Sequence, residues 1–131
     1  MANITFTKDL EIGIAMIDEQ HKELINRINN VSSTPNETQK TIDLLSEYVV
    51  KHFTDEQELH IKYNYPKAAE HKVLHQNFIN EFDKIKKKFS GSEDAFKISL
   101  ELIQFVVTWI IKHIKGVDIE FGRYYQENCL K

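Results

Sequence analysis

Apolar residues recur at alternating intervals of three and four along four long stretches of the chain. This spacing places the apolar side chains on one face of an α-helix and predicts four amphipathic helices. The predicted inward positions are Ile14, Ile17, His21, Leu24, Ile28 and Val31 in the first stretch; Ile42, Leu45, Val49, His52, Glu56, Leu59 and Tyr63 in the second; His71, Leu74, Phe78, Phe82, Ile85 and Phe89 in the third, with His75 beside them; and Phe96, Ser99, Ile103, Val106, Ile110 and His113 in the fourth.

Short breaks separate these helices. In residues 34–37 a threonine and a glutamate three positions later form a capping box, and the proline between them takes the first helical position. Tyr65-Pro66 ends the second helix and starts the third. Residues 90–92, Ser-Gly-Ser, separate the third helix from the fourth.

An irregular arm is predicted before the first helix, ending near Gly13, with Asp18 as the N-cap. Four long helices with short turns predict an all-α fold, an up-down-up-down four-helix bundle with an irregular N-terminal arm. Because no repeat or second region of distinct composition is present, residues 1–131 are predicted to form a single domain.

Composition narrows the functional classes. The net charge of -3 is mixed along the chain, which leaves no basic face for nucleic acid. The lone Cys129 cannot form an internal disulfide, as is typical of a protein in a reducing cytosol. The first residues lack the apolar core of a signal peptide, and the apolar run Leu102–Ile111 is about half the length of a membrane span. We expect a cytoplasmic monomer without nucleic-acid or membrane partners.

Ionisable residues occupy several inward positions. They are His21, His52, Glu56, His71 and His113, with His75 one turn along from His71. One such histidine is typical of an ordinary core residue, but an ionised glutamate in a dry core is costly without a counter-charge. Five histidines and a glutamate directed inward from four helices predict a bound cation, toward the end of the bundle where the second and third helices join.

Asp118 is the candidate for one more carboxylate. On an ideal helix it would point about 140° away from His113, because 3.6 residues make one turn. Gly116 lies between the two residues and can let the helix loosen or end there. Spacing alone leaves this assignment open.

The motifs match a known family. They are Gly13-Ile14 through Ile17-Asp18-Glu19-Gln20-His21; His52-Phe53-Thr54-Asp55-Glu56; Tyr65-Pro66 through His71 and His75-Gln76-Asn77-Phe78; and Trp109 through His113-Ile114 to Asp118. With these motifs the chain resembles the hemerythrins, specifically the short single-domain bacterial type, over nearly its full length.

The resemblance implies reversible binding of molecular oxygen at a non-haem di-iron centre with an oxo or hydroxo bridge. The implied ligands are His71, His75 and His113 for one iron, His21 and His52 for the other, and Glu56 and Asp118 as bridges. The second iron is then one ligand short, which keeps a position open for oxygen. Imidazole and carboxylate suit iron, although imidazole also binds zinc and copper.

An apolar oxygen pocket is also implied. Phe53, Trp109, Ile110 and Ile114 lie within a turn of the ligands and match apolar family positions. Such walls would exclude the water and protons that make oxygen binding irreversible. The same residues also serve as ordinary bundle core.

Three positions depart from the family pattern. Phe6 stands where the family usually has tryptophan, and Phe121 where tyrosine is common. His60 stands where methionine is usual, four residues after Glu56. We expect His60 to supply polarity at the surface or the bundle end rather than to contact a ligand.

Other functions fit the sequence less well than oxygen binding. A zinc protease would need glutamate directly after His71, where Lys72 stands. Ferritin-like di-iron proteins use Glu-x-x-His elements, which this chain lacks. The alternative on the same scaffold is an enzyme that reduces peroxide, oxygen or nitric oxide, or an oxygen or iron sensor. The enzyme would need a proton donor, and no acid beyond Glu56 and Asp118 suits that role, so we predict no catalytic residue. An iron store or a structural bundle would not account for so many inward histidines.

Overall fold

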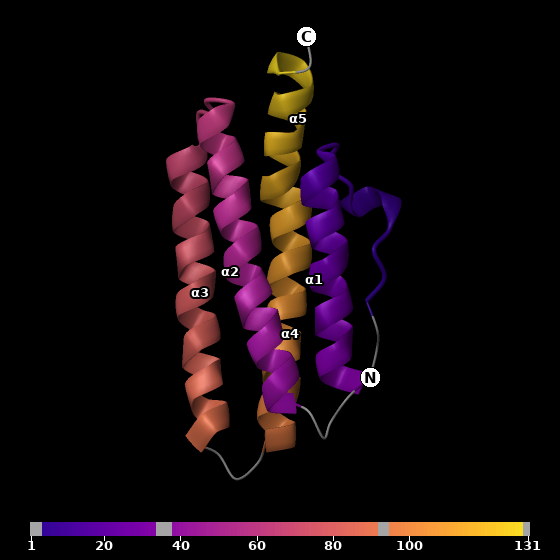
Figure 1. Ribbon diagram of the computed structural model, residues 1–131, viewed down its shortest axis with the longest axis vertical. Coiled ribbons are helices and arrows are strands. Elements are labelled where there is room, and N and C mark those ends of the chain that lie inside the picture. Colours follow the sequence, from indigo (N-terminus) through magenta and orange to yellow (C-terminus); the bar gives the residue numbers. More distant parts are fainter. Residues whose placement is uncertain (1–3, 34–37, 92–94, 130–131) are drawn as a thin grey trace.

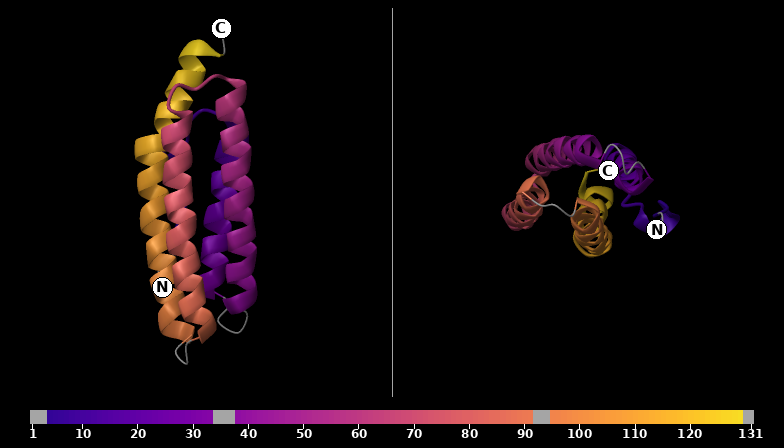
Figure 2. Two further views of the ribbon diagram at one scale, coloured as in Figure 1. Left: turned by 90° about the vertical axis from the view of Figure 1, so that its left-hand side faces the viewer. Right: turned by 90° about the horizontal axis from the view of Figure 1, so that it is seen from below.

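The computed structural model describes residues 4–33, 38–91 and 95–129. Its elements are η1 (Lys8–Leu10), α1 (Ala15–Ser33), α2 (Thr38–Lys62), α3 (Ala68–Gly91), α4 (Ala95–His113), the π-helical turn η3 (Ile114–Asp118) and α5 (Ile119–Asn128). Helices α1–α4 alternate in direction, and α5 prolongs α4 past the end of the bundle (Figure 1). Figure 2 shows the N-terminal arm on the outer side of α1. The predicted all-α four-helix bundle is confirmed.

The core follows the predicted helical spacing closely. All six predicted inward positions of the first stretch are buried, five of them on α1 and Ile14 just before it, as are the first five of α2. Leu59, Tyr63 and Ile103 are only half-buried, so they lie at the edges of the core. The predicted positions Phe89, Phe96 and Ser99 lie outside the side chains described. Within the described ranges, every helix is too short or too polar to serve as a membrane span.

Two predicted inward positions lie one residue away from the buried side chain. On α4, Leu102 is 1% exposed, whereas the predicted Ile103 is only half-buried. Leu74 is 37% exposed, whereas His75, placed beside the inward face, is 1% exposed. Relative to His71, an ideal helix puts Leu74 about 60° to one side and His75 about 40° to the other. Since Phe82 lies about 20° to the same side as His75, the buried face includes His75 and leaves Leu74 at its edge.

The start of α1 also differs from the prediction. The helix begins at Ala15, so Asp18 lies in its first turn and is not the N-cap. The Asp18 carboxylate instead accepts hydrogen bonds from the backbone N–H groups of Ile12 (2.8 Å) and Gly13 (3.2 Å). Gly13 has φ 89°, a left-handed conformation that turns the arm into the helix at little cost for glycine.

The break between α2 and α3 lies where Tyr65-Pro66 predicts it. Helix α2 ends at Lys62 and α3 begins at Ala68, with Asn64 in the left-handed region between them. At the other end, α3 runs through Gly91, so the helix ends on this glycine and not before Ser90. The predicted capping box at residues 34–37 lies outside the described residues.

Helix α5 holds the arm and the end of α2 together. The Gln126 side chain donates a hydrogen bond to the Gly13 carbonyl (2.7 Å), and the Tyr124 hydroxyl donates to the Tyr63 carbonyl (2.7 Å). Gly122 packs directly on the backbone of the arm, where a Cβ would lie 2.0 Å from the Ile12 carbonyl oxygen. These contacts fix the rotation of α5 about its own axis.

Candidate metal centre

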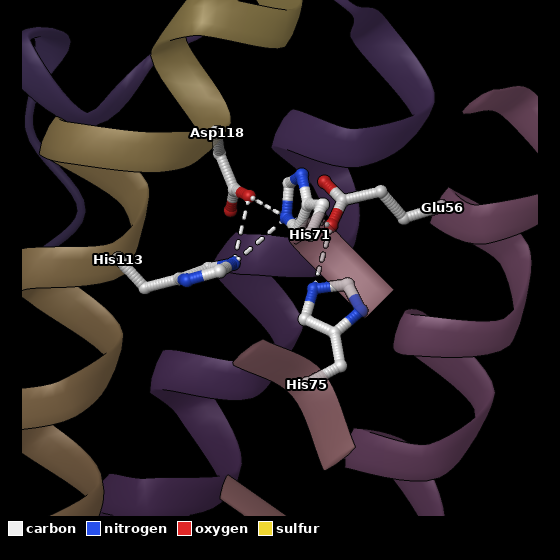
Figure 3. Close-up of side chains that lie close together, drawn as sticks. All are labelled: Glu56, His71, His75, His113 and Asp118. Atoms are coloured by element: carbon white, nitrogen blue, oxygen red, sulfur yellow. Dashed lines mark hydrogen bonds and ion pairs between the residues drawn. The ribbon is translucent and has the colours of Figure 1, made fainter. Parts of the chain in front are cut away.

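The structure brings all seven predicted site residues together in the half of the bundle next to the α2–α3 turn. Their potential ligand atoms form two groups, each with all atoms within 4.8 Å of one another. The larger group holds Glu56, His71, His75, His113 and Asp118, and the smaller holds His21, His52, Glu56 and Asp118. Each of these side chains is at most 6% exposed. Figure 3 shows the larger group, with the three imidazoles and the two carboxylates pointing toward a common centre.

In the larger group, nitrogen and oxygen atoms meet at close range. Glu56 Oε1 lies 3.1 Å from His71 Nε2 and 3.0 Å from His75 Nε2. Asp118 Oδ1 lies 2.9 Å from His71 Nε2 and 3.0 Å from His113 Nε2. The Nε2 atoms of His71 and His113 are themselves 2.9 Å apart.

The smaller group shares both carboxylates with the larger one. His21 Nε2 lies 3.1 Å from His52 Nε2 and 3.1 Å from Asp118 Oδ2. Asp118 therefore directs one oxygen to each group, which is the arrangement of a carboxylate that bridges two ions.

Asp118 reaches the centre because the helix widens before it. Residues Ile114–Asp118 form a π turn, in which the backbone N–H of Ile119 bonds to the Ile114 carbonyl five residues earlier. The wider turn brings Asp118 round to the side of His113, which an ideal α-helix would not do. A Cβ at Gly116 would meet no atom within 4 Å and its φ is not positive, so neither space nor backbone conformation requires glycine in this turn.

These residues fit two bound cations. Both oxygens of Glu56 and of Asp118, and His75 Nε2, are buried without a hydrogen bond of normal geometry among the described residues. Glu56 Oε1 and both oxygens of Asp118 lie 2.9–3.1 Å from the nearest imidazole Nε2 atoms. Two ligand atoms on one ion, with bonds of about 2.1 Å, would be separated by a similar distance. Imidazole nitrogens with bridging carboxylates suit iron, and also zinc or copper.

Residues 12–124 match the protein family described as the hemerythrin HHE cation binding domain. The chain belongs to the hemerythrin family. It is 34% identical over 123 residues to the bacteriohemerythrin of Stenotrophomonas maltophilia, covering 90% of this chain and 78% of that protein. The bacteriohemerythrin of Methylococcus capsulatus is 30% identical over 128 residues (93% and 96%), and the myohemerythrin of Theromyzon tessulatum 30% over 111 residues (85% and 84%). The resemblance seen in the sequence motifs is confirmed.

The electrostatics of this hemerythrin site favour a cation. Burial lowers the pKa of His52 to about 4, so its ring is neutral and able to bind metal. Burial also opposes a charge on His71, but the Asp118 and Glu56 carboxylates outweigh it and raise the pKa of His71 to about 9. Burial and mutual repulsion act against ionisation of Glu56 and Asp118, yet the surrounding imidazoles hold the pKa of each carboxyl below its usual range. Two buried anions therefore face the centre.

Two glutamines, which the sequence reasoning missed, support the site from outside. His52 Nδ1–H donates to Gln20 Oε1 (2.8 Å), and Gln20 Nε2 donates in turn to Asp55 (2.8 Å). His75 Nδ1–H donates more weakly to Gln57 Oε1 (3.3 Å). Such bonds fix the tautomer that leaves Nε2 free for metal. The sequence offers one indication of these glutamines, which is that each is next to a predicted site residue: Gln20 precedes His21 and Gln57 follows Glu56.

A small apolar cavity borders the smaller group. The four predicted residues Phe53, Trp109, Ile110 and Ile114 line it with Leu24, which the sequence reasoning placed only in the core. Its volume is about 10 Å³, the space of about one water molecule. Phe53 stacks on His75 at a centroid distance of 3.8 Å, and Trp109 stacks on His113 at 4.2 Å. The cavity walls thus also hold two of the imidazoles in place.

The prediction for His60 is wrong. This side chain is 1% exposed and lies between the site and the α2–α3 turn. Its ring is 4.4 Å from that of His71, 4.4 Å from that of Phe121 and 5.1 Å from that of Tyr65, measured between centroids. Phe121, the second departure from the hemerythrin pattern, is fully buried, and Phe6 packs partly buried on the core. Four residues after Glu56, His60 continues the buried face of α2 one turn further.

Proposed function

We propose that this protein reversibly binds molecular oxygen at two iron ions held by the seven clustered residues. Oxygen binding is the function of the hemerythrin family. The observation that carries the proposal is the inequality of the two ligand groups, five residues against four, with the smaller group beside the apolar cavity. An ion in the smaller group would keep a position open toward that cavity.

In this proposal each residue has a defined role. The larger group supplies His71, His75 and His113 to one iron, and the smaller supplies His21 and His52 to the other. Glu56 and Asp118 would be shared by the two irons and would balance their charge. Bound iron would supply the electrons that oxygen takes up on binding and returns on release.

The chain's own part in reversibility is to exclude water and protons. Leu24, Phe53, Trp109, Ile110 and Ile114 leave room for little more than one small molecule. Apolar walls keep solvent from replacing oxygen and from protonating it when it is reduced. Burial lowers the pKa of His52 to about 4, so this ring adds no acidic proton to the cavity wall.

This lining also favours a carrier over the alternative enzyme. Hemerythrins are oxygen-binding proteins rather than enzymes. Among the described residues that line the cavity, Asp118 is the one carboxylic acid, and it is assigned to the metals. A reductase of peroxide, oxygen or nitric oxide would need a separate proton donor at this place. We further propose a cytoplasmic monomer, for which sedimentation at several protein concentrations is the direct check of oligomeric state.

Metal analysis and optical spectra test the proposal together. Iron-loaded protein is expected to contain close to two irons per chain. The anaerobically reduced form should be colourless, become coloured when oxygen is added, and lose the colour again under vacuum. One metal or none per chain would refute the di-iron assignment, while a colour that vacuum does not reverse would indicate an oxidase.

A further inference from the structure

The five histidines of the proposed site differ in what their second ring nitrogen contacts. All five direct Nε2 toward the centre, which leaves Nδ1 to carry a proton and seek an acceptor. His52 and His75 find one in the side-chain carbonyls of Gln20 and Gln57. His21 Nδ1 and His71 Nδ1 are both buried without a hydrogen-bond partner among the described residues. Of these two rings, His71 lies against His60, an imidazole outside the seven site residues.

His60 also lacks hydrogen-bond partners for its ring nitrogens. Both of its ring nitrogens are buried without a hydrogen-bond partner among the described residues. A neutral imidazole offers one acceptor nitrogen and one N–H donor. Since the ring centroids of His60 and His71 are 4.4 Å apart, each ring lies against the other with its polar edge unsatisfied. Buried polar groups in this state are rare in folded proteins.

Two further aromatic rings enclose His60. The Phe121 ring stands perpendicular to it at 4.4 Å, and the Tyr65 ring lies at 5.1 Å, both measured between centroids. Phe121 has no polar group, and neither nitrogen of His60 receives a hydrogen bond from the Tyr65 hydroxyl. His71 Nδ1–H is an unpaired donor on a ring that lies against His60.

We propose that His60 is a positioning residue for His71, accepting a hydrogen bond from His71 Nδ1–H either directly, after a small rotation of the imidazole, or through one bound water. His60 then plays for the iron of the larger group the part that Gln20 plays for His52. The bond fixes the tautomer of His71 and increases the electron donation of its Nε2 to the metal. This inference rests on the proposed function, because His71 must be a metal ligand.

Two substitutions separate this role from simple packing. His60→Gln keeps a side-chain acceptor of the type that supports the other two imidazoles, and His60→Met fills the space with an apolar group. If His60 only fills space, methionine should do as well as histidine, and glutamine should do worse because it buries an unsatisfied amide. If His60 accepts from His71, glutamine should retain function and methionine should lose it.

The test uses the whole chain loaded with zinc, so that its readouts do not depend on oxygen binding. Zinc affinity is measured by competition with a chelator, and the His71 Nδ1–H proton is observed by NMR with isotope-labelled histidine. We expect His60→Met to weaken zinc binding roughly 10- to 100-fold and to speed exchange of that proton with solvent, with both properties largely restored in His60→Gln.

The outcomes distinguish this inference from the proposed function. Equal affinity and equal proton exchange in the two variants, or a methionine variant that matches the parent, would overturn the role of His60 and leave the metal site intact. A chain that binds neither zinc nor iron would overturn both. Failure of the iron-loaded protein to bind oxygen reversibly, with the zinc results as expected, would overturn only the oxygen carrier.

Discussion

The two halves of the bundle use the same helical spacing for opposite kinds of contact. Away from the α2–α3 turn, the inward positions hold aliphatic and phenyl side chains such as Ile28, Leu45 and Phe82. Toward the turn, the same faces carry five buried imidazoles and two carboxylates of the proposed site, with His60 beyond them. The apolar half is stabilised by its own contacts, because apolar groups gain free energy wherever they leave water. The polar half needs a cation to balance its buried anions.

The largest expected effect comes from removing a ligand in one half and a core residue in the other. Ile28→Ala should cost about 2–5 kcal/mol of unfolding free energy whether or not iron is present, through the cavity it leaves. His71→Ala should abolish most of the stabilisation that iron gives, roughly 3–5 kcal/mol or more. Denaturant unfolding of metal-free and iron-loaded forms, with iron counted per chain, measures both. Equal stabilisation by iron in His71→Ala and Ile28→Ala would contradict the ligand role of His71.

The next effect is a pH dependence of the unfolding free energy that we expect in the metal-free protein and not in the iron-loaded one. The pKa of His71 is about 9 in the folded chain against about 6.5 when unfolded. A raised pKa contributes stability that is fully present below pH 6.5 and is lost as the pH rises through 9. The metal-free protein should therefore lose about 3 kcal/mol between these values.

Iron-loaded protein provides the control for this pH dependence. When His71 Nε2 is bound to metal, this nitrogen no longer takes up a proton. The loss of unfolding free energy between pH 6.5 and 9 should then disappear. Equilibrium unfolding at stepped pH gives the comparison. A loss of the same size in both forms would show that another group is responsible.

A smaller effect is expected in the cavity wall. Ile114→Glu places a carboxyl group at a position that is 1% exposed, next to His113. The carboxylate would admit water, and its protonated form could donate to reduced oxygen. The coloured form made with oxygen should decay at least about 10-fold faster than in the parent, a change of about 1.4 kcal/mol in the barrier. Stopped-flow spectroscopy follows this decay, with Ile114→Val as the apolar control.

The smallest effect concerns the edge of the third helix. Leu74→Ala should change the unfolding free energy by no more than about 0.5 kcal/mol, because that side chain is 37% exposed. Phe82→Ala, two turns further along the buried face, should cost about 3–5 kcal/mol. Thermal or denaturant unfolding of the pair checks which residues of α3 face the core.

Residue spacing predicted the fold and the burial of the inward histidines and Glu56 well, because a period of 3.6 governs both. It placed Leu74 on the buried face of α3 and His75 beside that face. Intervals of three and four residues both fit a helix face, so the spacing does not determine where the centre of the face lies. His60 was predicted to supply polarity at the surface or the bundle end, and its burial was missed because the sequence does not show how far along α2 the neighbouring helices cover it. The support from Gln20 and Gln57 depends on side-chain conformation, which periodicity does not encode. Asp118 could be assigned only through the family motif, because the π turn breaks the period on which the spacing argument depends.

The π turn at Ile114–Asp118 also sets how α5 is rotated about its own axis relative to α4. If this turn tightened into α-helix, Asp118 would swing by about 100°, the angle of one residue, and α5 would turn with it. That rotation would break the Gly122 packing on Ile12 and the Gln126 bond to Gly13. These contacts therefore oppose rotation of α5, and the orientation of the Asp118 carboxylate is maintained by residues four to eight positions further along the chain.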